Sequence, residues 1–259
     1  MKNLQKAGGV SAIIAAATYL FTMGLVVSML KPMADSTLGF QEYMAFLIAN
    51  KLLVFIWHFS MYLINGFCLA VLVLALHERL KNSSPSLAKI ASAFGFIWTA
   101  FVFLSGMIMN YGIESLITLY GKNQGRAESL KNALDTITMG IDSSDKYLGC
   151  LWVRLVSLAA FKNKVFPKTF NVFGLAISAA GLIGTMIPAL VSVSYIFGVG
   201  AIVWWLAVGI YMLTSISTVP NWANSGEPHG QFQAKVITNC LPPNHGIGVG
   251  SLASPEATR

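Results

Sequence analysis

The stretch LLVFIWHFSMYLINGFCLAVLVLAL, from Leu52 to Leu76, decides the class of fold because it contains no Asp, Glu, Lys or Arg. A helix needs about 20 predominantly apolar residues to cross the roughly 30 Å hydrocarbon core of a bilayer. This stretch is long enough for one crossing. It therefore predicts an integral membrane protein rather than a soluble domain.

The composition of the whole chain agrees with this interpretation. Of its 259 residues, 55% are hydrophobic and only 10% are charged, and the mean hydropathy is +0.66. Soluble domains carry about 25% charged residues, so this chain has too little charge to cover the surface of a soluble enzyme. Its apolar content also excludes an intrinsically disordered chain.

Five further apolar runs accompany this stretch, and one of them is short. The short run, Tyr147–Phe161, covers only about 22 Å as a helix and contains Arg154. The four longer runs are Gly8–Leu30, Ile90–Ile113, Phe170–Ser192 and Tyr195–Ile216. The number of spans therefore depends on whether the short run crosses.

Basic residues between the runs indicate that it does. Short cytoplasmic loops are rich in Lys and Arg, and three basic clusters fit this rule: Lys2 and Lys6; Arg79, Lys81 and Lys89; Lys162, Lys164 and Lys168. All three fall on one side only if Tyr147–Phe161 crosses. We therefore predict an all-α integral membrane bundle of six transmembrane helices in residues 1–216, with cytoplasmic N- and C-termini, in the cell membrane.

The net charge of +7 follows from this orientation. No basic stripe interleaved with aromatic residues is present, so we expect the lipid bilayer, and no nucleic acid, as a partner. Small residues at four-residue spacing indicate close helix contacts, within one chain or with a second copy or another membrane protein. These ridges are Gly8, Ala12 and Ala16, and Ala176, Ala180 and Gly184.

The connecting segments differ in their patterns. Lys31–Lys51 has the pattern of a short helix at the membrane interface. Glu114–Lys146 predicts two short amphipathic helices around a Gly-Lys-Asn-Gln-Gly turn. Residues 217–259 are rich in Gly and Pro, which is typical of a flexible cytoplasmic tail. The spacing of the lysines that precede three of the helices also raises a 2+2+2 hairpin repeat as one alternative.

Four polar residues within the runs are candidate site residues, because polar groups are costly inside a membrane. His58, Tyr62 and Asn65 fall at i, i+4 and i+7 and so on one helical face. They form either a site for a small polar ligand or a hydrogen-bond network that sets packing. Arg154 is expected to extend toward the cytoplasmic headgroups.

Several chemistries are excluded by the residues present. We predict no catalytic, cofactor-binding or metal site, because the chain has no HExxH, P-loop, GxGxxG or GxSxG motif. His229, Cys240 and His245 match no zinc spacing. No Asp or Glu lies within a predicted span, so no intramembrane carboxylate is expected. A membrane enzyme would need a cluster near Asp142 and Asp145.

Four segments together resemble a known family. They are Leu4–Tyr19, Leu74–Lys81, Ala91–Trp98 with Ser105–Ile108, and Gly149–Ala160. Their order is similar to that in the bacterial multi-pass membrane proteins of the domain-of-unknown-function family DUF4386. The resemblance covers about residues 1–216 and implies six spans, but no reaction, cofactor or catalytic residue. Family members typically carry an apolar residue in place of Arg154 and end soon after the sixth span.

Three classes of function remain open. The first is a non-enzymatic membrane component, structural or acting through partners. The second is a small permease or ligand-binding protein that uses the His58, Tyr62 and Asn65 face. The third is a membrane enzyme without a recognisable motif. A cavity that reaches both His58 and Asn65 would favour the second class, and a fully packed bundle would favour the first.

Overall fold

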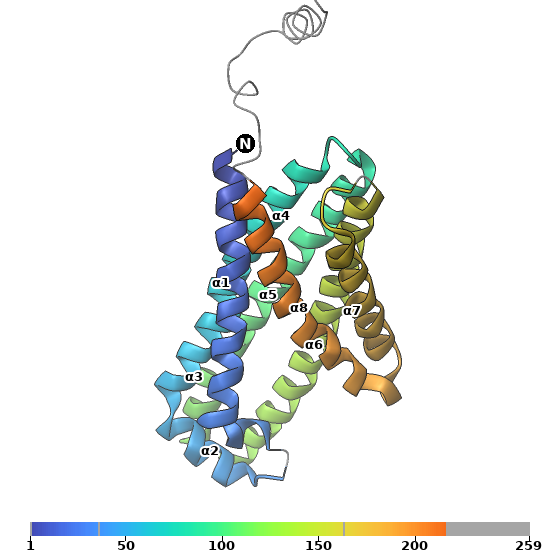
Figure 1. Ribbon diagram of the computed structural model, residues 1–259. Helices are drawn as coiled ribbons and strands as arrows, with labels where there is room; N and C mark the ends of the chain where they lie inside the picture. The colour runs from blue at the N-terminus through green and yellow to red at the C-terminus, as the bar shows by residue number, and fades with distance from the viewer. Residues whose placement is uncertain (1, 36, 163, 216–259) are drawn as a thin grey trace, which may run out of the picture. The chain divides into compact units, whose positions relative to one another are not determined.

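The computed structural model describes residues 2–35, 37–162 and 164–215, and within these ranges the only regular structure is helical (Figure 1). The predicted tail, with Cys240, His229 and His245, lies outside the described residues. The elements are α1 (Lys2–Ser28), η1 (Lys31–Ala34), α2 (Phe40–Ala49), α3 (Lys51–His58), η2 (Phe59–Ile64), α4 (Asn65–Leu80), α5 (Pro85–Tyr120), α6 (Gln124–Lys162), α7 (Lys168–Met186), η3 (Pro188–Leu190) and α8 (Val191–Thr214).

Five helical segments are long and apolar enough to cross a membrane. They are α1, the continuous segment α3–η2–α4, α5, α7 and α8, with mean hydropathies between 1.5 and 2.2. They correspond to the five longer apolar runs, whose helical character is confirmed. The short run Tyr147–Phe161 forms the last part of α6, whose earlier part is polar. α6 is therefore not among the five.

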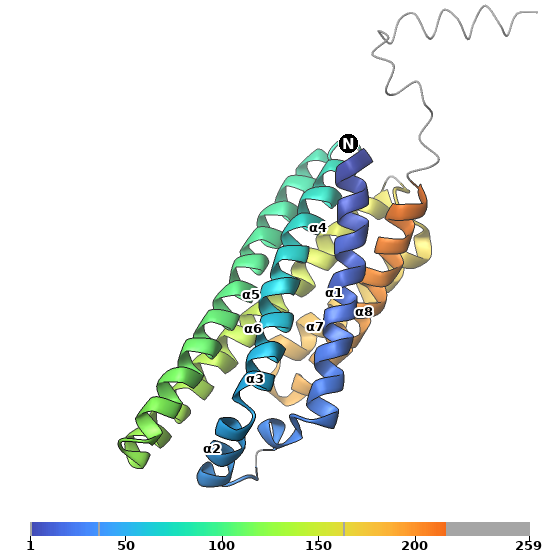
Figure 2. The ribbon, with the colours of Figure 1, turned by 90° about the vertical axis from the view of Figure 1, so that its left-hand side faces the viewer.

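The long helices pack as a closed ring. In order of contact they are α1, α4, α5, α6, α7 and α8, and α8 packs against α1 again (Figures 1 and 2). Each helix runs antiparallel to the one before it in the sequence. α6 thus takes a full place in the ring, between two of the apolar helices.

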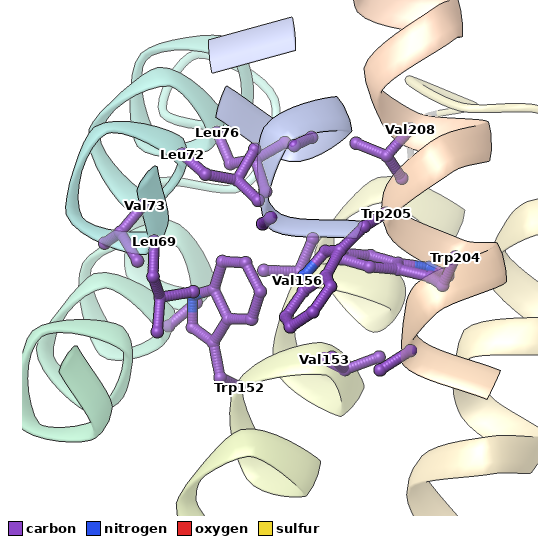
Figure 3. Packing of buried hydrophobic residues seen from close by; sticks show 14 of the residues in the cluster. Leu69, Leu72, Val73, Leu76, Trp152, Val153, Val156, Trp204, Trp205 and Val208 are labelled. Carbon is purple, nitrogen blue, oxygen red and sulfur yellow. The ribbon is translucent and has the colours of Figure 1, made fainter. Parts of the chain in front are cut away.

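Tryptophan side chains fill the centre of this ring. Trp98 from α5, Trp152 from α6 and Trp204 and Trp205 from α8 are each at most 2% exposed. Their rings lie 5.4–6.1 Å apart in successive pairs. Figure 3 shows that aliphatic side chains of α4 and α6 surround Trp152, Trp204 and Trp205. This core occupies the half of the bundle nearer to the start of α1.

Small residues set the closest helix contacts. Gly9 of α1 meets Gly209 of α8, where a Cβ on either residue would lie within 3.0 Å of the other's carbonyl oxygen. Gly8, Ala12 and Ala16 are buried, as the first predicted ridge requires. The second predicted ridge does not form a contact within this chain, because Ala176 is exposed, and a contact with a second copy or another membrane protein stays a prediction. The contact face of α7 consists instead of Asn171, Gly174, Ile177, Ser178, Gly181 and Gly184.

The segment Glu114–Lys146 does not form separate short helices. α5 continues to Tyr120 and α6 begins at Gln124, so the predicted turn is present but the flanking helices are extensions of the long ones. Figure 2 shows α5 and α6 side by side to the end of the bundle where α2 lies. Apolar residues recur at helical spacing on both sides of this turn, so the turn is the one break between the two long helices. The short helix expected in Lys31–Lys51 is present as α2.

Candidate functional site

A single π-helical turn interrupts the second long helical segment at the predicted polar face. η2 widens the turn between α3 and α4, and π turns within α-helices are frequent at functional sites. The wider turn changes the angular spacing on which the prediction of one shared face depended. As a result His58 bonds to α5, whereas Asn65 bonds to α1.

The His58 side chain is fully buried, and only one of its ring nitrogens is paired among the described residues. Nδ1 lies 3.1 Å from Oδ1 of Asn110, while Nε2 has no hydrogen-bond partner there. Because an amide oxygen only accepts hydrogen bonds, this pairing places the proton on Nδ1 and leaves a lone pair on Nε2. A buried acceptor without a donor costs about 1–3 kcal/mol. His58 is therefore a candidate for contact with a ligand.

Tyr62 and Asn65 have different surroundings. The Tyr62 ring stays beside His58, with centroids 5.9 Å apart. Asn65 is 1% exposed and donates from Nδ2 to the carbonyl of Ala15 and the hydroxyl of Thr18, both at 3.2 Å. Interhelical bonds of this kind position helices against each other. Packing between α4 and α1 thus accounts for Asn65.

Two carboxylates of α6 lie level with the middle of an apolar helix. Close contacts fix the pairing of α5 with α6: Gly112 with Leu134, and Trp98 with Gly149. Asp142 and Asp145 fall between these contacts and therefore opposite the run Ile90–Ile113. The expectation that no Asp or Glu lies within a membrane span stays a prediction. It treated the first part of α6 as an outer loop.

Aromatic side chains from three other helices surround these carboxylates. Tyr19 of α1 and Tyr62 of η2 lie within electrostatic range of both Asp142 and Asp145. Oδ1 of Asp145 is enclosed and has no hydrogen-bond partner among the described residues. The buried indole N–H of Trp98 is close to this carboxyl but makes no bond of good geometry within the same ranges. The carboxylates thus occupy a polar centre with unused hydrogen-bonding capacity.

A cavity of about 940 Å³ lies beside this centre, at the end of the bundle formed by α2 and the α5–α6 turn. Its walls come from α1, η1, α2, α3, α5, α6 and α8. Charged and aromatic side chains among its walls include Asp35, Glu128, Asp135, Asp142, Trp57 and Tyr195. Sites for small molecules typically combine apolar and aromatic walls with a few convergent polar groups. This cavity has that composition.

The charge inside the cavity is negative. Lys131 lies 2.6 Å from Asp135 and 4.6 Å from the ring centre of Tyr43, so its ammonium is already engaged. Hydrogen bonds from the hydroxyl and N–H of Thr37 lower the pKa of Asp35, which keeps that carboxylate ionised. Burial, followed by the charge of Asp135, raises the pKa of the Tyr43 phenol, which stays neutral.

A smaller pocket of about 60 Å³ adjoins the cavity at His58. One water molecule needs roughly 10–15 Å³ of such space, so this pocket can hold a larger group. The two spaces share Met33, Tyr43, Met109, Lys131, Asp135 and Thr138 as walls. Asn65 does not line either one. The predicted three-residue site is therefore divided: His58 lines the smaller pocket, Tyr62 lies beside His58 but lines neither space, and Asn65 is separate.

Arg154 is half-buried on α6, eight residues before the end of the helix at Lys162. That spacing places its Cα about 12 Å from the helix end. Within the part of the chain that the structure describes, no ion pair or hydrogen bond is formed by its guanidinium. Its expected extension toward the headgroups stays a prediction. In the same ranges no group of three His, Cys, Asp or Glu side chains could hold a metal ion.

Sequence reasoning missed the carboxylates of α6, although a signal was present. Asp135, Asp142 and Asp145 are separated by seven and three residues, which places them on one face of a helix. From the sequence alone, Asp142 and Asp145 are named only as the place for an enzyme's cluster and are assigned to an outer loop. Read as a helical face, the same residues would have predicted a polar stripe directed at a neighbouring helix.

Comparison with known proteins gives a family but no function. No curated protein and no solved structure matches the chain. Over residues 7–215 the chain matches the family described as Domain of unknown function (DUF4386). The match spans nearly all the residues that the structure describes, including the ring of long helices, the cavity and His58. The chain therefore belongs to the DUF4386 family.

Proposed function

We propose that α6 is a sixth membrane-crossing helix and that the protein crosses the cell membrane six times, with both termini in the cytoplasm. α6 packs against α5 and α7, two of the apolar helices, and runs antiparallel to both. The start of α1, the α4–α5 connection and the α6–α7 connection all lie at one end of the bundle and carry the basic clusters. This arrangement agrees with the positive-inside rule. The 2+2+2 repeat stays a prediction.

The length of α6 supports this topology. The apolar run Tyr147–Phe161 alone is too short to cross, but the helix continues toward its N-terminus without a break. The added turns carry Asp142 and Asp145 toward the bundle interior and the cavity. Ionisable residues within membrane proteins almost always face the bundle interior or a water-filled cavity. A crossing helix that is polar on one face is consistent with that rule.

We infer that the protein binds a small ligand in the 940 Å³ cavity and acts as a non-enzymatic permease or ligand-binding protein. The cavity itself is the observation that supports this function. Its adjoining pocket reaches His58 but not Asn65, so the expected criterion of a cavity that reaches both residues is not met. In the proposed topology it lies at the outer side of the membrane. The tryptophan core fills the other half of the bundle, so a ligand entering from outside would reach the pocket lined by His58 but not the cytoplasm. The structure would then correspond to an outward-open state.

A structural membrane component that acts through partners is the second candidate. The buried Asn65 and the dense tryptophan core favour it, because both serve packing alone. This candidate gives no account of a large cavity with four carboxylates. For that reason we place it second.

The topology is testable with reporter fusions. Alkaline phosphatase joined after Gly121, at the α5–α6 turn, should be active, because that turn is expected outside. The same enzyme joined after Val165, beyond α6, should be inactive, whereas a fluorescent protein at this position should fluoresce. High phosphatase activity at both positions would contradict a crossing by α6.

Ligand binding is testable by blocking the cavity. The purified full-length protein should gain thermal stability with at least one class in a panel of small amines, carboxylates, alcohols and neutral aromatics. Thr138→Trp fills the cavity and should abolish this gain. Thr136→Trp is the matched control, since Thr136 is exposed on the same helix and lines neither space. No gain with any class, together with a Thr138→Cys thiol that small reagents cannot reach, would contradict an open binding cavity.

A further inference from the structure

We propose that the cavity takes a small organic amine in its protonated form, with an N–H of the ammonium group donating to Nε2 of His58. This inference rests on the proposed ligand-binding function and names the class of ligand. Three observations support it: the hydrogen-bonding state of His58, the charge of the cavity, and the aromatic rings beside the histidine.

The hydrogen-bonding state of His58 leaves Nε2 free to accept from a ligand donor. Asn110 accepts from Nδ1, so Nε2 is an acceptor, and it is buried without a partner among the described residues. His58 lines the 60 Å³ pocket, which is large enough for an ammonium group. A carboxylate or a carbonyl would bring a second acceptor to this position and leave Nε2 unpaired. A donor group fits, and an ammonium is a strong one.

The charge of the cavity selects a cation among the possible donors. Four carboxylates, Asp35, Glu128, Asp135 and Asp142, line the cavity together with one ammonium, that of Lys131, which Asp135 already engages. Lys31 does not line the cavity but lies near Asp35. Lys146 lies near Asp142 but directs its ammonium over the ring of Tyr195, 5.5 Å from its centre. The remaining excess of negative charge attracts a cation and repels an anion over several ångströms.

Aromatic rings beside His58 favour an ammonium with an apolar body. The Trp57 ring centre lies 4.8 Å from that of His58, and the Tyr62 ring centre lies 5.9 Å from it. Of these two rings, Trp57 also lines the larger cavity, where an aromatic face attracts a cation. Met33 and Met109 line both the pocket and the larger cavity, so they form a continuous apolar path for the rest of the molecule.

The test uses three probes of similar size with the full-length protein in detergent. They are 2-phenylethylamine, its N,N,N-trimethyl analogue, which has no N–H donor, and 3-phenylpropanoate. We expect calorimetry to show the amine binding at least tenfold more tightly than either of the others. Equal binding of the trimethyl analogue would overturn the hydrogen bond to His58. Preference for the carboxylate, blocked by Thr138→Trp, would overturn the amine class while leaving the proposed function intact.

Variants test the residue itself. His58→Phe keeps a ring of similar volume but removes the acceptor, and it should weaken amine binding about tenfold or more, the range expected for a hydrogen bond to a charged group. Asn110→Ala keeps the imidazole but removes the acceptor that holds the proton on Nδ1, so either ring nitrogen can carry the proton. It should weaken binding by a smaller factor, and it serves as the test if His58→Phe does not fold. Asn65→Ala, which lines neither space, should lower thermal stability without changing affinity. Unchanged amine affinity in both His58→Phe and Asn110→Ala would overturn the inference. If no probe binds any form of the protein, the amine class fails. The ligand-binding function fails as well only if no class in the panel stabilises the protein and the Thr138→Cys thiol is unreachable.

Discussion

Gly184→Ala is expected to destabilise the protein by about 1–3 kcal/mol or more, the range for overpacking a close contact. A Cβ at Gly184 on α7 would overlap the backbone nitrogen of Ser194 in the first turn of α8. The Cα of Ser194 and the carbonyl carbon of Val193 are also within 2.9 Å of that position. Backbone atoms cannot rotate away as a side chain can, so α8 must shift relative to α7. The fraction of protein that stays monodisperse after heating in detergent measures the effect.

Gly198→Ala is the matched control for this substitution. Gly198 lies on α8, and a Cβ there would meet nothing within 4 Å. Alanine stabilises a helix interior by about 0.8–1 kcal/mol relative to glycine, so this variant should be as stable as the wild type or slightly more so. The two substitutions are thus expected to have opposite signs. Equal loss of stability in both would show that helix propensity or detergent, and not the α7–α8 contact, controls the result.

Trp205→Ala is expected to cost about 3–5 kcal/mol, the usual range for removal of a buried aromatic ring. Trp205 is 1% exposed, stacks on Trp98 at 6.1 Å and meets the edge of Tyr19 at 5.2 Å. Its removal would leave a void at the centre of the ring of helices. Unfolding in SDS, followed by near-ultraviolet circular dichroism, should show the transition at a much lower detergent fraction.

Two comparisons identify the cause of that loss. Trp205→Phe should cost much less, because it keeps a ring and removes an indole N–H that has no partner among the described residues. Phe67→Ala removes a side chain that is 71% exposed and should change stability by no more than about 0.5 kcal/mol. A loss for Phe67→Ala as large as that for Trp205→Ala would contradict a core centred on the tryptophans.

The sequence pattern predicted the long apolar helices, because the length and composition of each run are sufficient to predict its helix. A run such as Leu52–Leu76 shows its length and lack of charge without reference to any other segment. The short helix within Lys31–Lys51 was predictable for the same reason. The family, too, was predictable from the order of four local segments.

The cavity and the polar centre were not predictable in the same way. They depend on which helices become neighbours, and hydrophobic periodicity does not specify a partner. The π turn at η2 separated Asn65 from His58 by changing a spacing that the sequence pattern assumed to be regular. Asp142 and Asp145 were interpreted as loop residues, because the apolar run that predicted the helix begins only after them.

The closure of the ring between α1 and α8 has a consequence for biosynthesis. The Gly9 face of α1 has its partner at Gly209, roughly 200 residues later in the chain. At about 5–20 residues per second, the first helix would wait some 10–40 s in the membrane before its neighbour is made. During that time its small-residue groove is open to lipid, to the insertion machinery or to the wrong helix. A chain that stops before α8 would keep two unsatisfied faces, on α1 and on α7, and would be a natural target for membrane quality control.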